Sequence, residues 1–193
     1  MIETAKGIPE FQDNGCLPYK CYEVTLEEIK EKLVDNFPDS KTRQSRFECF
    51  LTFYNDLLSN VKSCVRLFID GSFVTNKNNP RDVDFVIIVD SLKLTQDEKF
   101  YLEDILSKKN NLKKEFLEYE NFVKMGILHE SSLYNLGFYK LGCDFFQVVK
   151  YDTSHRMYTE YIKERDDWIS WWGHQRNGVE KGFLNLPVEY GGD

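Results

Sequence analysis

The spacing of hydrophobic residues predicts helices in both halves of the chain and strands in its middle. Thr25 is followed three residues later by Glu28, a capping-box pattern that begins a helix over 25–37. Apolar residues then recur every three or four positions through 40–61, which predicts the strongest helix of the chain. A second capping-box pair, Thr95 and Glu98, begins another helix near residue 96. The pattern also favours helices over residues 112–128 and 155–173, the latter rich in aromatic residues and ending at Gly173.

Continuous apolar runs predict the strands. Residues 65–73 and 82–89 are two such runs joined by a polar connection. Beyond its first residues both faces of the run over 82–89 are apolar, as in a sheet covered on both sides. A third run, 138–152, predicts a strand or a hairpin through Gly137 and Gly142. The order of the elements indicates an α+β fold, a short mixed sheet flanked by helices. Along the chain, helices come first, followed by two adjacent strands, a helix, a strand and a last helix.

The chain has 193 residues and neither an internal repeat nor a Gly, Ser or Pro-rich linker, which predicts a single domain over 1–193. Its predicted parts include an irregular or extended N-terminal arm (1–22) and a C-terminal aromatic helix with an irregular tail (154–193). The oligomeric state is left open.

The charge and the composition of the chain limit the classes of function that it could have. A net charge of −7 and a pI near 5.1 argue against a protein that coats nucleic acid, although a local basic patch can still bind RNA. Arg43 and Arg46, beside the first long helix, are candidates for such a patch. The sequence lacks both the apolar length of a membrane span and the pattern of a signal peptide. The five scattered cysteines have no zinc-site spacing, so we expect reduced, buried thiols and a cytoplasmic protein that does not bind membranes.

Two acids stand where the strand over 82–89 begins. Asp82 and Asp84 are two residues apart, so in a strand their side chains project from the same face. Two ionised carboxylates this close repel one another, and a carboxylate in a sheet is costly to desolvate unless it has a partner. A divalent cation such as Mg²⁺ is one such partner, and it commonly binds one or two carboxylates together with substrate phosphates.

Gly71 and Ser72 end the preceding strand, where a phosphate could approach the glycine backbone and the serine could donate a hydrogen bond. Asp144 is a third acid inside an apolar run and is the candidate to complete a two-metal site with Asp82 and Asp84. Lys77 and Arg81 lie in the connection between the two strands and could contact a triphosphate.

Gly71-Ser72, nine intervening residues, then Asp82-Val83-Asp84 and an apolar strand resemble the signature of the polymerase-β-like nucleotidyltransferase superfamily. Asp144 looks like that superfamily's third strand carboxylate, and the chain is similar in its order of elements to small toxin–antitoxin and phage-defence members. The resemblance covers about 20 residues plus Asp144. It implies catalytic, metal-binding roles for Asp82, Asp84 and Asp144 with two Mg²⁺ ions (or Mn²⁺). It also implies transfer of a nucleoside monophosphate from an NTP such as ATP to a hydroxyl of an RNA (for example a tRNA 3′ end), a protein or a small molecule.

Other interpretations remain open at this point. Asp82 and Asp84 could instead form ion pairs with Arg81 or Lys77, and Asp144 could simply face water. The protein could be a catalytically silent relative that binds a partner protein of a defence or toxin–antitoxin system, or a metal-dependent nuclease, which has no use for the Gly-Ser turn. The tryptophans of the last helix could stack on a base or bind a partner, but packing in the core is the favoured interpretation: Trp168, Trp171 and Trp172.

Overall fold

The computed structural model describes residues 2–125, 142–175 and 177–188, without the side chains of residues 112–124. Its elements, in chain order, are strands β1 (Thr4–Lys6) and β2 (Cys21–Glu23), helix α1 (Leu26–Lys30), a π-helical turn (Glu31–Asp35), helix α2 (Arg43–Asn60), strand β3 (Cys64–Asp70), a 3₁₀ turn (Ser72–Val74), strand β4 (Val83–Asp90), helix α3 (Gln96–Lys124), strand β5 (Cys143–Lys150), helix α5 (Tyr158–Trp172) and strand β6 (Phe183–Pro187).

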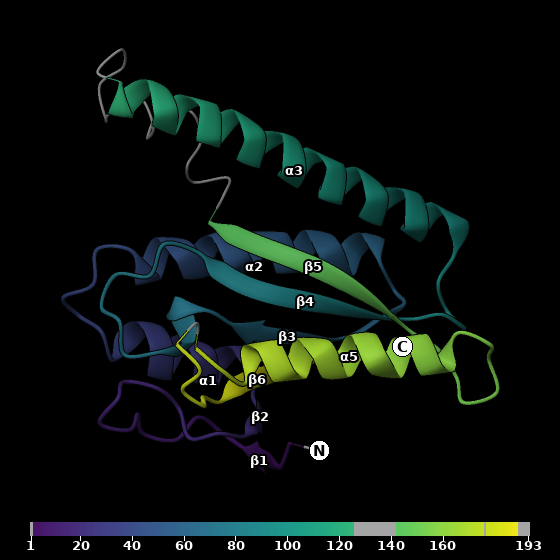
Figure 1. The fold of residues 1–193 in the computed structure, drawn as a ribbon, viewed down its shortest axis with the longest axis horizontal. Coiled ribbons are helices and arrows are strands. Elements are labelled where there is room, and N and C mark those ends of the chain that lie inside the picture. The colour runs from purple at the N-terminus through teal and green to yellow at the C-terminus, as the bar shows by residue number, and fades with distance from the viewer. Residues whose placement is uncertain (1, 126–141, 176, 189–193) are drawn as a thin grey trace.

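The strands form one six-stranded sheet in the order β1-β2-β6-β3-β4-β5. Neighbours pair in parallel except at β6–β3 and β3–β4, which are antiparallel, so the sheet is mixed. Figure 1 shows α2 and α5 on opposite sides of the β4–β5 part of the sheet and α3 running along its edge beyond β5. The predicted mixed sheet flanked by helices is therefore confirmed.

Aromatic side chains join the sheet to the helices on its two faces. Phe85 of β4 packs against Phe50 of α2, with ring centroids 5.3 Å apart. On the opposite face, Phe146 of β5 packs against Trp168 of α5 at 4.7 Å. Burial on both faces explains why the sequence of β4 is continuously apolar rather than alternating.

The local signals at the helix starts were correct. At Thr25 and Thr95 the threonine side chain accepts the backbone N–H of the glutamate three residues later, and that glutamate accepts the threonine N–H in return. Helix α5 ends at Gly173, as predicted. The hairpin considered through Gly137 falls on residues outside the described part of the chain.

The prediction of an irregular C-terminal tail was wrong. Residues 183–187 form β6, which lies inside the sheet between β2 and β3. The first four residues of β6 are buried, including Asn185. A five-residue strand that contains an asparagine and ends in a proline lacks both alternation and length, so periodicity gives no signal for it.

The proposed basic patch at Arg43 and Arg46 was also wrong, because both side chains are buried. The Arg43 guanidinium donates hydrogen bonds to the backbone carbonyls of Leu33, Phe73, Thr75 and Lys77. Its planar fork of five N–H donors suits several acceptors at once. Arg43 therefore fixes the chain that follows β3.

The five cysteines are free thiols, four of them buried, as expected. Among the described residues, no helix combines the length and the apolar character that crossing a membrane requires.

Candidate functional site

Three aspartates form a row across neighbouring strands. Asp84 of β4 is paired directly with Asp70 at the end of β3 on one side and with Asp144 near the start of β5 on the other. Residues paired directly across strands share a face of the sheet, so the three carboxylates project together, on the face that also carries Phe146. Asp82 comes two residues before Asp84 and joins them at the same edge. The structure thus brings Asp82, Asp84 and Asp144 together, as predicted, and adds Asp70.

Each acid except Asp84 has an ion pair. Lys181 Nζ lies 2.6 and 2.7 Å from the two carboxylate oxygens of Asp70, and both side chains are buried. Lys109 of α3 reaches Asp144 at 3.3 Å.

Exposed Arg81 lies 3.6 Å from Asp82, one of the ion pairs considered from the sequence. Among the described residues no cation pairs with Asp84.

The pKa of Asp84 is raised by its burial and by the neighbouring acids. Burial, followed by the charges of Asp82, Asp144 and Asp70, raises the pKa of Asp84 to about 7, against a smaller opposing effect of Lys181. Burial also raises the pKa of Asp70 to about 6, because desolvation outweighs the attraction of Lys181. The edge of the sheet therefore holds a group of acids whose central carboxylate, Asp84, has no counter-ion among the described residues.

Gly71 lies directly against this carboxylate. Its backbone has φ of 78°, a conformation that favours glycine, and a Cβ added there would lie 1.8 Å from Asp84 Oδ2. The glycine therefore makes room for Asp84 as well as for any ligand. Ser72 follows and begins the 3₁₀ turn. That Gly71 and Ser72 receive a phosphate stays a prediction.

The loop after this turn is held from two directions. Arg43 of α2 donates hydrogen bonds to three carbonyls of this loop, as described above. Thr75 forms an isolated β-bridge with Cys16, and Asn76 N–H donates to the carbonyl of Gly15. The N-terminal segment thus contributes to the same region, and Lys77 remains exposed at its rim.

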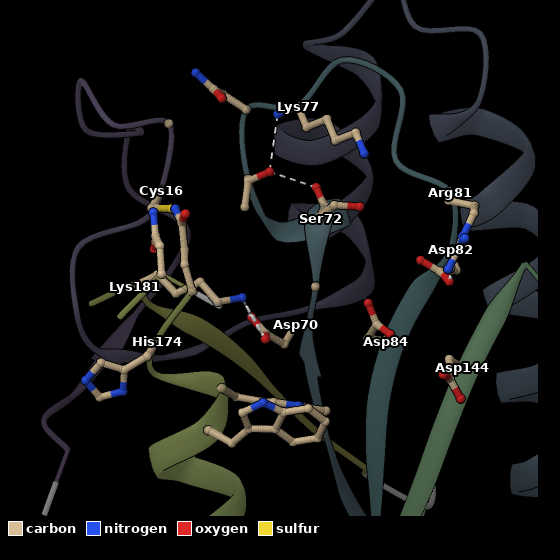
Figure 2. Close-up of a pocket in the computed structure, with 18 of the residues that line it drawn as sticks. Cys16, Asp70, Ser72, Lys77, Arg81, Asp82, Asp84, Asp144, His174 and Lys181 are labelled. Atoms are coloured by element: carbon tan, nitrogen blue, oxygen red, sulfur yellow. Dashed lines mark hydrogen bonds and ion pairs between the residues drawn. The ribbon is translucent and has the colours of Figure 1, made fainter. Parts of the chain in front are cut away.

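These groups surround a pocket of about 830 Å³, a size typical of small-molecule sites. Figure 2 shows Asp82, Asp84 and Asp144 on one side of it and Cys16, His174 and Lys181 on the other. The lining residues include all seven predicted site residues: Gly71, Ser72, Lys77, Arg81, Asp82, Asp84 and Asp144.

Sequence reasoning missed Asp70 and Lys181. Asp70 could have been identified as a site residue from the sequence, because it is an acid at the end of an apolar run immediately before Gly71. Lys181 had none, since it lies 111 residues away in the segment predicted to be irregular.

The aromatic helix divides between core and pocket. Trp172 is buried and Trp168 packs on Phe146, as the core interpretation expected, whereas Trp171 is 61% exposed. Both Trp171 and Trp172 line the pocket.

The side chains at this edge are carboxylates, the type of ligand that a hard divalent cation prefers. In the described part of the chain, one of them, Asp84, has no counter-ion. Within the described residues, however, no group of three or more His, Cys, Asp or Glu side chains is arranged so that it could hold a metal ion as it stands. A cation at this edge would need further oxygen ligands.

Comparison with known proteins places the chain in a family. Residues 9–187 match DUF6932, described as a family of unknown function. No curated protein and no solved structure matches the chain significantly. Because the matched residues make up most of the sequence, the protein belongs to the DUF6932 family.

Proposed function

We propose that the protein is a Mg²⁺-dependent nucleotidyltransferase that transfers a nucleoside monophosphate from an NTP to an acceptor hydroxyl. One observation carries the proposal. The Gly71 backbone lies against the carboxylate of Asp84, which is paired across the sheet with Asp144, and all three line one large pocket. A glycine turn beside clustered acids suits a phosphate bound together with a divalent cation.

The ligand preferences of Mg²⁺ suggest that the cation would bind together with the nucleotide. Mg²⁺ keeps several waters and is commonly bound by one or two carboxylates plus phosphate oxygens. Asp82 and Asp84 would hold it, and the triphosphate would supply ligands that the protein lacks. When bound, the metal neutralises charge on the phosphates and lowers the pKa of the attacking hydroxyl.

The chain's own residues would then position the reaction. Lys77 and Arg81 at the rim of the pocket would contact the triphosphate. Asp144 would bind a second Mg²⁺ together with Asp82 and Asp84, or accept the proton of the acceptor hydroxyl. The hydroxyl oxygen forms a bond to the α-phosphorus, and the bond from that phosphorus to the β-phosphate oxygen breaks, which releases pyrophosphate.

The internal ion pairs favour one rival function. Lys109 and Lys181 already neutralise Asp144 and Asp70, as would suit a site without metals. In that case the protein would be a catalytically silent relative that binds a partner protein.

Nucleotide binding and transfer decide between the two. The protein is incubated with each labelled NTP, Mg²⁺ and either total RNA or cell lysate, and label on a macromolecule is measured. Calorimetry compares NTP binding in Mg²⁺ and in EDTA. The proposal expects binding that depends on Mg²⁺, and transfer that Asp144→Asn abolishes.

Asp90→Asn is the matched control. Asp90 lies at the other end of β4, its exposure is 18% against 17% for Asp144, and it too faces a lysine, Lys150 at 3.9 Å. This variant should keep full activity. Absence of Mg²⁺-dependent NTP binding in the parent protein would reject the enzyme and favour the silent relative.

A further inference from the structure

The pocket has two chemically different halves. Its four acids, Asp70, Asp82, Asp84 and Asp144, all come from the edge formed by β3, β4 and β5. Among the described residues, the rest of the lining contains no acid, and its basic side chains are those of Lys77, Arg81, His174 and Lys181. It also includes an exposed indole and several side-chain amides: Asn14, Asn76, Trp171, Gln175 and Asn177. A ligand that fills both halves would carry a polyanion with a metal at one end and a flat, neutral, hydrogen-bonding group at the other.

Trp171 is available to such a group. Its neighbours on α5 are held by packing: Trp172 also lines the pocket but is only 6% exposed, and Trp168 lies against Phe146. Trp171 contacts Trp168 with ring centroids 5.2 Å apart, yet 61% of it remains exposed, and it lines the pocket. An indole held by an aromatic neighbour and exposed in a pocket can stack on a planar ligand at little entropic cost.

Two of the amides that line the pocket have their oxygen bound by the protein, whereas Gln175 Nε2 donates to Cys16 Sγ. Asn14 Oδ1 accepts the backbone N–H of Cys16, and Asn177 Oδ1 accepts that of Val179. Because the oxygen of each amide is engaged by the protein, its NH₂ group remains as the donor. Donors of this kind match the ring-nitrogen and carbonyl acceptors of a nucleobase.

We propose that Trp171 is the stacking platform for the base of the bound nucleotide, which makes the non-acidic half of the pocket a nucleobase site. This inference rests on the proposed function, since the triphosphate is what brings the base into the pocket. Stacking is tolerant of base identity, so Trp171 supplies affinity for the heteroaromatic ring and the amides discriminate among bases.

The experiment compares ATP, GTP, CTP and UTP with inorganic tripolyphosphate, which has the same phosphates and no base. Binding is measured with Mg²⁺ by calorimetry and by quenching of tryptophan fluorescence, for the parent, Trp171→Ala and Trp171→Phe. Phe100→Ala is the control, because Phe100 is 59% exposed on α3 and does not line the pocket.

We expect the best NTP to bind about 10-fold more tightly than tripolyphosphate and to quench fluorescence, which tripolyphosphate does not. Trp171→Ala should lose most of that 10-fold advantage and the quenching, leave tripolyphosphate affinity unchanged, and be partly rescued by Trp171→Phe. The Phe100 variant should behave as the parent.

Two results overturn the inference while the proposed function stands: equal affinity for NTPs and tripolyphosphate, or an NTP advantage that survives in Trp171→Ala. If neither NTPs nor tripolyphosphate bind the parent protein in Mg²⁺, the proposed function fails and the base site fails with it. Because tripolyphosphate tests the acidic half alone, these failures are distinguishable.

Discussion

At the residue scale, the raised pKa of Asp84 makes stability depend on pH. The pKa of Asp84 is about 7 in the fold, above the ordinary value of 3.8 that applies to the unfolded chain. The folded state therefore binds a proton that the unfolded state has released between about pH 4 and pH 7, and metal-free stability falls as pH rises through that range. Asp70, whose pKa is raised to about 6, adds to the same trend.

Replacing Asp84 by Asn should remove the part of the stability loss at high pH that is due to the Asp84 carboxylate. In EDTA at pH 8 we expect Asp84→Asn to be more stable than the parent by about 1 kcal/mol after screening. The difference should disappear below about pH 4, where the parent carboxyl is protonated in both states. Mg²⁺ should raise the melting temperature of the parent and do little for the variant.

Thermal melts at both pH values test this, with Asp90→Asn as the control from the other end of β4. A variant that melts below the parent in EDTA at pH 8 would show that the Asp84 carboxylate stabilises the fold.

Gly71 offers a second test at this scale. Gly71→Ala places a Cβ 1.8 Å from Asp84 Oδ2 and also strains a backbone with φ of 78°. Gly178 has nearly the same φ, 82°, with nothing within 4 Å of an added Cβ, so Gly178→Ala reports the strain alone. We expect the Gly178 variant to lose about 1 kcal/mol of unfolding free energy and the Gly71 variant about 2 kcal/mol or more. Urea unfolding measures both, and equal losses would mean that Asp84 moves aside freely.

At the scale of elements, the loop between β3 and β4 depends on α2 for its shape. Arg43 at the start of α2 satisfies four backbone carbonyls, three of them in residues 73–77. Burial lowers its pKa to about 10, so it stays charged at neutral pH and holds these acceptors strongly.

Arg43→Lys should loosen the pocket loop. A single ammonium cannot reach all four carbonyls, and the buried acceptors left over cost about 3 kcal/mol of stability. Amide hydrogen exchange should accelerate for residues 73–77. Arg156→Lys, at an exposed position, should change neither quantity. Unaltered exchange in Arg43→Lys would mean that other contacts hold the loop.

At the scale of the whole molecule, the C-terminal segment completes both the sheet and the pocket. β6 lies between β2 and β3, so without it β1 and β2 lose their connection to the rest of the sheet. Lys181, immediately before β6, is the counter-ion of buried Asp70. A buried carboxylate that loses its partner is strongly destabilising, typically by about 3–5 kcal/mol.

A chain that ends at residue 178 should therefore fail to fold, whereas one that ends at residue 188 should fold and bind NTP like the parent. Circular dichroism and the cooperativity of thermal unfolding compare them. A cooperative, parent-like transition in the shorter chain would show that β6 is dispensable.

Local signals in the sequence determined the helix starts at Thr25 and Thr95, the buried strands β3, β4 and β5, and the projection of Asp82 and Asp84 from one face. Such features depend on residues a few positions apart, through helical or strand periodicity and side chain to backbone hydrogen bonds. Only the tertiary structure decided the rest. It placed β6 inside the sheet, buried Arg43, paired Lys181 with Asp70 and left Trp171 exposed in the pocket while Trp168 packed against Phe146. These outcomes depend on contacts between residues far apart in the sequence, where the same side chain can satisfy burial, charge or exposure according to what the fold brings beside it.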